Sequence, residues 1–284
     1  MVYTISLGDP DYPALLAEIP HPPQTLYVRG QIPKNIPLIA VVGTRRSTRY
    51  GQQITEEIAA DLARSGIGVV SGLALGIDGF AHTSALRVGG TTLAVLGSGV
   101  DEDSVYPVSH RKLAETIIKN GGALISEYPP GSKPAQYTFP ARNRIIAGIT
   151  LGTLVTEAPQ ESGALITAYH ALEFNRDVFA VPHAATSTMG IGCNRLISQG
   201  ATLTTHAAVI ADTLHLLLSP KQYATPPLEP NQLILYEALS HEPQTIDELL
   251  IKTSLPSYQV LGILSILEMH GLIRCQAGRY IKNQ

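Results

Sequence analysis

The chain has 284 residues, of which 44% are hydrophobic and only 15% charged, and its formal net charge is −3. Such a chain can bury enough apolar area to fold compactly, which excludes an intrinsically disordered protein. The small negative charge excludes nucleic-acid binding through overall charge, so any such binding requires a local basic patch. Cys193 and Cys275 lie far apart without zinc-site spacing, so we expect no disulfide, no metal and no cofactor.

The first 37 residues form a proline-rich leader. Its seven prolines exclude a long helix, and we predict one short helix at Pro13–Glu18 and one strand at Thr25–Arg29, packed on the main domain. The N-terminus has no basic segment followed by an apolar one, and no stretch approaches the roughly 18 apolar residues of a membrane span. We therefore expect a cytoplasmic protein without membrane contact.

Between residues 38 and 217, short apolar segments alternate with helical segments. The predicted strands are Leu38–Val42, Gly68–Ser71, Thr92–Leu96, Ala123–Ser126, Leu151–Thr156, Asp177–Ala180 and a weaker one near Ala201–Thr204. The predicted crossover helices are Gly51–Ser65, Ile77–Val88, Ser109–Asn120, Ala141–Ala147 and Gly163–Asn175. Strands that are apolar throughout are typical of parallel sheets covered on both faces. We predict an α/β fold with an extended Rossmann-like, doubly wound parallel sheet, which binds ligands at the carboxyl ends of its strands.

The C-terminal part predicts a linker and a second, small domain. Residues 218–230 are proline-rich, as linkers often are. Residues 231–284 predict a winged-helix domain, with helices at Asn231–Ser240, Thr245–Lys252 and Ser257–His270 and hairpin strands at Leu272–Cys275 and Arg279–Ile281. Over residues 226–284 four Lys and Arg face six Asp and Glu, and the third helix has no Lys or Arg. The hypothesis is that this domain contacts protein, or only the parent domain, because a DNA-reading helix should be basic.

Two basic segments contain no acidic residue: Val42–Gly51 (VGTRRSTRYG) and Phe139–Gly148 (FPARNRIIAG). The first lies between a predicted strand and a predicted helix, where backbone N–H groups, the helix dipole and arginines can hold an anion. It lacks the spacing of a Walker A loop or a GxGxxG motif. The alternative is a tight turn with solvated arginines, and three arginines in one loop favour the anion site.

The second basic segment adds aromatic residues to its cations. Lys133, Arg142 and Arg144 alternate with Tyr137 and Phe139, a combination typical of single-stranded nucleic-acid sites, where aromatics stack on bases. Composition alone equally allows a core phenylalanine with arginines paired to the acids at positions 127 or 157. The expected position on the same rim as the first basic loop favours the binding site.

Two further segments contain groups that could do chemistry. In Ser71–His82 (SGLALGIDGFAH), Asp78 and His82 are four residues apart on one helix face, as an acid/base pair could be. We favour an aspartate at the helix start with a locally satisfied histidine, because no nucleophile lies nearby. Glu157, in the loop EAPQESG, could polarise a ribose or water, or could simply orient that loop.

Taken together, these motifs resemble those of the DNA-processing protein A family (DprA or Smf) over residues 1–215. The segments that carry the resemblance are Leu26–Gly30 (LYVRG), Val42–Gly51, Ser71–His82, Phe139–Gly148, Val155–Ala168 (VTEAPQESGALITA) and Asn194–Ala201 (NRLISQGA). The resemblance implies a single-stranded DNA binder without catalytic activity. It would form homodimers through its Rossmann-like domain, protect incoming DNA in natural transformation and recombination, and load RecA recombinase, with single-strand-binding protein as a further partner.

The same resemblance implies which residues contact single-stranded DNA, with Phe139 as a stacking platform. They are Gly43, Thr44, Arg45, Ser71, Gly72, Lys133, Phe139, Arg142, Asn143 and Arg144. One departure is that Val181–His183 reads VPH where the family usually reads VPG, which puts the turn in question if glycine is needed there for positive φ.

Two alternatives to the DNA-binding function remain open. The chain is distantly similar to the lysine decarboxylase-like nucleoside-monophosphate phosphoribohydrolases, which would make it a nucleotide-binding enzyme. Their PGGxGTxxE signature is absent, and EAPQESGALITA takes its place. A scaffold protein without nucleic-acid affinity is the third possibility.

Overall fold

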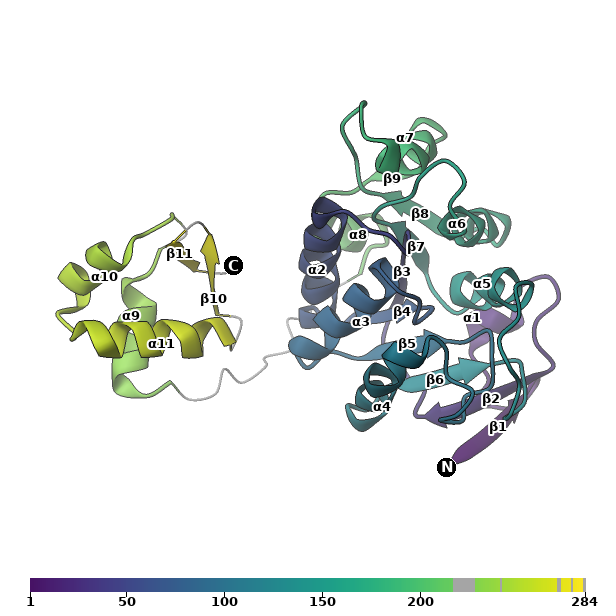
Figure 1. Cartoon of the computed structure of the whole chain (residues 1–284). Coiled ribbons are helices and arrows are strands. Elements are labelled where there is room, and N and C mark those ends of the chain that lie inside the picture. Colours follow the sequence, from purple (N-terminus) through teal and green to yellow (C-terminus); the bar gives the residue numbers. More distant parts are fainter. Residues whose placement is uncertain (217–227, 241, 270–271, 277, 283–284) are drawn as a thin grey trace. The chain divides into compact units, whose positions relative to one another are not determined.

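The computed structural model describes residues 1–216, 228–240, 242–269, 272–276 and 278–282. The chain forms two compact units, Met1–Lys221 and Gln222–Gln284 (Figure 1). Their boundary falls in the segment that the sequence predicts to be a linker, and residues 218–227 of that segment lie outside the described residues.

A nine-stranded sheet runs through the first unit in the order β1-β2-β6-β5-β4-β3-β7-β8-β9 (Figure 1). Its strands are β1 (Val2–Ser6), β2 (Thr25–Gly30), β3 (Leu38–Val42), β4 (Gly68–Ser71), β5 (Thr92–Val95), β6 (Ala123–Ser126), β7 (Gly152–Val155), β8 (Asp177–Ala180) and β9 (Thr202–Leu203). Strands β3 to β9 pair in parallel, whereas β2 pairs antiparallel with both β1 and β6. The predicted Rossmann-like, doubly wound fold is confirmed, with an antiparallel extension at one edge.

Helices cover both faces of this sheet. The helices are α1 (Ala14–Ala17), α2 (Arg49–Arg64), α3 (Ile77–Arg87), α4 (Arg111–Lys119), α5 (Thr138–Gly148), α6 (Ala164–Glu173), α7 (Ile191–Ser198) and α8 (Ala207–Thr213). Alternate residues of β3 enter separate cores: Ala40 and Val42 pack with α1, α5, α6 and α7, while Ile39 and Val41 pack with α2, α3 and α8. Burial on both faces explains why the strand sequences are apolar throughout.

Four elements differ from the sequence prediction. Strand β1 was not predicted, and neither were the short helices α7 and α8. The helix predicted at Ala141–Ala147 begins three residues earlier, at Thr138. Pro140 suggests a helix break in the sequence, but it occupies the first turn of α5, where a backbone N–H has no partner within the helix and proline is tolerated. The earlier start places Phe139 on the helix rather than in the loop before it.

The second unit has the predicted order of three helices followed by a hairpin. Its elements are α9 (Pro230–Ala238), α10 (Ile246–Thr253), α11 (Ser257–Met269) and the antiparallel strands β10 (Ile273–Gln276) and β11 (Arg279–Lys282). Leu235, Leu249 and Leu264 form the centre of a separate apolar core, so this unit has a hydrophobic centre of its own.

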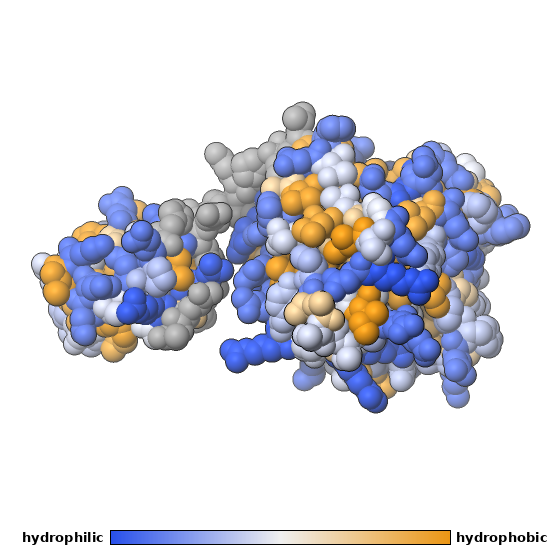
Figure 2. All heavy atoms as spheres, turned by 90° about the horizontal axis from the view of Figure 1, so that it is seen from above, coloured by the Kyte–Doolittle hydropathy of each residue, from blue (hydrophilic) through white to orange (hydrophobic). Residues whose placement is uncertain are grey.

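Apolar side chains also reach the surface of both units, among hydrophilic ones (Figure 2). On α11, Tyr258 and Leu261 are exposed although neighbouring residues of the helix are buried. Within the described residues no single helix is long and apolar enough to cross a membrane, and α10 with α11 passes that test only as a pair bent by 111°. These two helices supply much of the core of the second unit.

Candidate nucleic-acid interface

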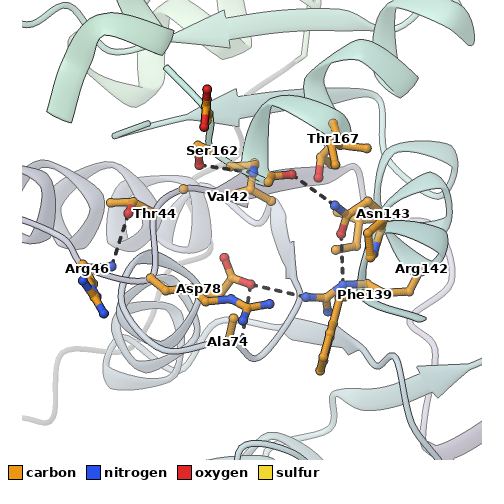
Figure 3. A pocket seen from close by; sticks show the side chains of 18 of the residues that line it. Val42, Thr44, Arg46, Ala74, Asp78, Phe139, Arg142, Asn143, Ser162 and Thr167 are labelled. Carbon is orange, nitrogen blue, oxygen red and sulfur yellow. Dashed lines mark hydrogen bonds and ion pairs between the residues drawn. The ribbon is translucent and has the colours of Figure 1, made fainter. Parts of the chain in front are cut away.

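A cleft of about 870 Å³ lies at the carboxyl ends of the central strands (Figure 3). Its walls come from the loops after β3, β4, β5, β6 and β7 and from helices α5 and α6, as expected for a doubly wound sheet. The charged and aromatic residues of the lining are Arg45, Arg46, Asp78, Tyr106, Phe139, Arg142 and Glu161. The two basic segments of the sequence therefore meet at one cavity.

The loop after β3 is held tightly against the start of α3. A Cβ on Gly43 would lie 2.5 Å from Cγ1 of Ile77, so the close approach requires glycine. The N–H of Thr44 donates to the carbonyl of Glu157 at 2.8 Å, and the Thr44 hydroxyl accepts from the N–H of Arg46 at 3.2 Å. Arg45 and Arg46 are exposed beyond this anchored turn, where their charges are available to an anion.

Arg45 extends over an aromatic ring of the second basic segment. Its Cζ lies 5.1 Å from the ring centroid of Phe139, a cation–π distance. The Phe139 ring is half-buried and touches that of Tyr106, with 5.8 Å between ring centroids and 45° between planes. A cation and a pair of aromatic rings thus line the cleft together, which is what backbone neutralisation combined with base stacking requires.

Arg142 lines the cleft, but the residue is only 5% exposed. Its guanidinium donates to the carbonyl of Gly72 at 2.6 Å, to that of Val95, and to Oδ1 of Asn143 at 3.0 Å. The carboxylate of Asp78 lies 3.9 Å away. Burial lowers the pKa of Arg142 to about 10, opposed by Asp78, so the side chain stays charged at neutral pH. It binds the loop after β4, the end of β5 and α5 to one another.

The ten residues predicted to contact single-stranded DNA fall into two groups. Gly43, Thr44, Arg45, Phe139, Arg142 and Asn143 line the cleft, whereas Ser71, Gly72, Lys133 and Arg144 do not. Arg144 forms an ion pair with Glu127 at 2.5 Å, so for this arginine the sequence alternative of a structural pair is confirmed. Buried Ser71 donates to the carbonyl of Val41 at 2.6 Å. Lys133 is exposed on the loop that leads to α5.

Asp78 and His82 do not form an acid/base pair. The carboxylate of Asp78 accepts from the N–H groups of Gly72 and Ala74, at 3.1 and 3.3 Å, and desolvation raises its pKa. Nδ1 of His82 lies 2.7 Å from the hydroxyl of Thr92, and burial lowers the histidine pKa to about 3. The histidine is therefore neutral. The favoured interpretation holds for Asp78 at the helix start, but His82 is satisfied only at Nδ1, because its Nε2 is buried without a hydrogen-bond partner.

Glu157 anchors the start of α2. Both carboxylate oxygens are engaged by Thr48, the helix N-cap, through its N–H at 2.7 Å and its hydroxyl at 2.6 Å. A Cβ on Gly51 would lie 2.3 Å from this carboxylate. Of the two roles that the sequence left open for Glu157, orientation of a loop is the one that these contacts support.

The VPH turn does not require glycine. His183 does not have positive φ, and its Nε2 lies 2.9 Å from the carbonyl of Thr156, to which it must donate. Its ring meets that of Tyr50 edge to face, with centroids 5.1 Å apart. The histidine packs the turn against the start of α2.

Sequence reasoning did not single out Tyr106, Glu161 or Thr167, all of which line the cleft. A signal was present, because Tyr106 follows β5 and Glu161 follows β7, and a doubly wound sheet binds ligands at the carboxyl ends of its strands. Motif spacing does not reveal which residue of a loop faces inward. Among the described residues no group of three or more His, Cys, Asp and Glu could hold a metal ion.

Comparisons with known proteins agree with this geometry. The family model described as DNA recombination-mediator protein A matches residues 3–215, and the model described as DprA winged helix domain matches residues 219–279. A Synechocystis protein called Smf is 41% identical over 310 aligned residues, covering 95% of this chain and 77% of that protein. The predicted winged-helix domain is thereby confirmed.

Two solved structures are similar to this chain over about three quarters of its length. The X-ray structure of DNA processing protein A from Streptococcus pneumoniae has a TM-score of 0.69 at 39% identity, covering 74% of this chain and 73% of that one. DNA processing protein A from Helicobacter pylori, whose structure is described as showing a single-stranded DNA binding mode, has a TM-score of 0.66 at 28% identity. That match covers 75% of this chain and 95% of the other.

Proposed function

This chain belongs to the DNA recombination-mediator protein A family (DprA/Smf) and carries the winged-helix domain of that family, and we propose that it binds single-stranded DNA in the cleft between β3 and α5. The observation that carries the proposal is the position of Arg45 over the Phe139 ring, at 5.1 Å, in a cleft formed by the two basic segments. A relative is described as a single-stranded DNA binder.

The residues of the cleft divide the binding between phosphate and base. The exposed guanidinium groups of Arg45 and Arg46 neutralise backbone phosphates, and Lys133 extends this basic surface along the neighbouring loop. Phe139 offers its ring to a base. Arg142 and Asp78 largely cancel each other's charge beneath them, so Arg142 acts as a positioning residue that fixes the loops carrying the other groups.

Fluorescence anisotropy with labelled oligo-dT tests this proposal. Stacking or charge contacts of this kind contribute about 1–3 kcal/mol each, so we expect Arg45→Ala to weaken binding about tenfold and to reduce the salt slope by about 0.7. Arg87→Ala is the matched control, because Arg87 is exposed at the end of α3 and outside the cleft lining. Equal affinity of the Arg45→Ala variant and the wild type would contradict the assignment.

We infer further that the protein is a cytoplasmic recombination mediator without catalysis. On this account a homodimer, formed through the first unit, holds single-stranded DNA and delivers it to RecA recombinase, in competition with single-strand-binding protein. The family description supports the role of mediator. The test is RecA-catalysed strand exchange on DNA coated with single-strand-binding protein. The protein should accelerate the reaction, and an absence of acceleration would contradict this role.

The enzymatic alternative lacks a free acid at the expected position. Glu157 would have to polarise substrate or water, yet both of its carboxylate oxygens accept hydrogen bonds from Thr48. Release of free base from nucleoside monophosphates by the purified protein would revive this alternative.

For the winged-helix domain we propose contact with protein or with the parent domain. Helix α11 has no Lys or Arg, and it exposes Tyr258 and Leu261, a surface better suited to protein than to the DNA backbone. Loss of duplex affinity on Arg279→Ala in the full chain would contradict this proposal.

A further inference from the structure

Tyr106 is an aromatic residue of the cleft that belongs to neither basic segment. It lies between β5 and α4, lines the cleft and is 47% exposed. The residue before it, Val105, is buried in the apolar core beneath α4. The backbone is therefore anchored where the ring projects, unlike that of a tyrosine on a loose surface loop.

Asp101 ties the loop of Tyr106 to the loop that precedes α5. Its carboxylate accepts from the hydroxyl of Ser104 at 2.8 Å and from the N–H of Gly131 at 2.7 Å. Its carbonyl accepts from the N–H groups of Ser104 and Val105, at 3.1 and 3.2 Å. The N–H of Gly99 donates across to the carbonyl of Ser132 at 3.0 Å. These bonds fix the loop of Tyr106 relative to the segment that carries Lys133 and leads to Phe139.

The rings of Tyr106 and Phe139 adjoin at 5.8 Å and 45°. Because the two rings are in contact, no base fits between them. The rings therefore cannot sandwich a base. Because Tyr106 remains about half exposed, it can offer a face of its own to a ligand. With Arg45 over Phe139, the wall of the cleft runs from a cation through one aromatic ring to a second.

We propose that Tyr106 is a second base-stacking residue, which takes the base adjacent to the one on Phe139. The cleft then binds two consecutive nucleotides of a single strand with little regard to sequence, because every base has a π-face. A cavity of about 870 Å³ is large enough for more than one base. This inference rests on the proposed function and extends the predicted set of contacts by one residue.

The main alternative is that Tyr106 only shields Phe139 from water. Tyr106→Leu separates the two roles, since leucine keeps an apolar cover but has no flat π-face. Tyr106→Phe keeps the ring and removes only the hydroxyl. Tyr169→Ala is the matched control, because Tyr169 is 41% exposed on α6 and lies outside the cleft lining.

The experiment compares thymidine 5′-monophosphate with the dinucleotide pdTpdT by calorimetry on the full chain. In the wild type the second nucleotide should raise affinity, and Tyr106→Leu should reduce that gain about tenfold while leaving mononucleotide affinity unchanged. Tyr106→Phe and Tyr169→Ala should behave as wild type. A 2-aminopurine in the second position should be quenched by the wild type and not by Tyr106→Leu.

Three results would overturn the inference. They are an unchanged gain in Tyr106→Leu, an equal loss for the mononucleotide and the dinucleotide, and a loss in Tyr169→Ala as large as that in Tyr106→Leu. Failure of the proposed function is distinguishable, because the wild type would then bind neither oligo-dT nor the dinucleotide.

Discussion

Arg142 shows how a residue chosen for its charge can serve the fold of a binding site. Its guanidinium bonds the carbonyls of Gly72 and Val95 and lies beside Asp78, with almost no surface exposed. A Cβ on Gly72 would lie 2.1 Å from the guanidinium nitrogens, so glycine is required for this contact. A buried ion pair adds little net stability, but loss of one partner leaves a buried charge without compensation.

Loss of the Arg142 side chain should therefore destabilise the folded chain. Arg142→Met should lower the free energy of unfolding by about 3 kcal/mol, measured by urea denaturation followed by circular dichroism. Asp78→Asn in the same chain should recover part of the loss, because it removes the orphaned charge. Wild-type stability together with abolished DNA binding would instead identify Arg142 as a direct phosphate contact.

Because His82 is buried and neutral, the free energy of unfolding should depend on pH. Burial lowers its pKa to about 3 in the folded protein from 6.5, so below about pH 6.5 the unfolded chain takes up a proton that the folded chain does not. The contribution of His82 to the free energy of unfolding should therefore be lost as the pH falls from about 6 to about 4, by roughly 1 kcal/mol per pH unit. His82→Gln should remove this component. Parallel stability profiles of the two proteins over that range would show that His82 does not titrate in this way.

Among the elements, the start of α2 depends on a bond across the cleft rim. Thr48 caps the helix and donates its hydroxyl to Glu157, which follows β7. Thr48→Val should lower the free energy of unfolding by about 1–2 kcal/mol and weaken oligo-dT binding, because the same loop carries Arg45. Thr116→Val is the control, since the exposed Thr116 hydroxyl bonds only the carbonyl of Lys112 on its own helix. Equal melting temperatures for the two variants would contradict this role of Thr48.

The elements of the sheet could be predicted from sequence because burial on both faces leaves an unmistakable apolar pattern. The start of α5 could not, since Pro140 suggests a break and its tolerance depends on its place in the first turn. Strand β1 lies at the sheet edge with mostly partly or fully exposed residues, so it has no continuous apolar signal.

The sequence predicted the residues of the candidate site only in part. The predicted order of strands and loops placed Arg45 and Phe139 on one rim of the sheet, and both line the cleft. It could not assign Arg142 to buried carbonyls or Arg144 to Glu127, since those partners come together only through tertiary packing. The sequence also did not show that the side chain of Tyr106 faces the cleft.

At the scale of the whole molecule, the two units suit different ligands. The first unit places exposed cations and aromatic rings in one cleft, while α11 of the second unit lacks basic residues. We therefore propose that the first unit binds single-stranded DNA and that the second contacts protein. Because overall charge is slightly negative, we expect the affinity for DNA to depend on this local patch.

Photocrosslinking tests whether single-stranded DNA occupies the cleft. An oligo-dT carrying 4-thiothymidine is irradiated with the full chain, and the crosslinked peptides are identified by mass spectrometry. We predict crosslinks in the segments that contain Phe139 and Tyr106, and their loss when excess unlabelled oligo-dT competes. Crosslinks confined to residues 228–282 would contradict the account.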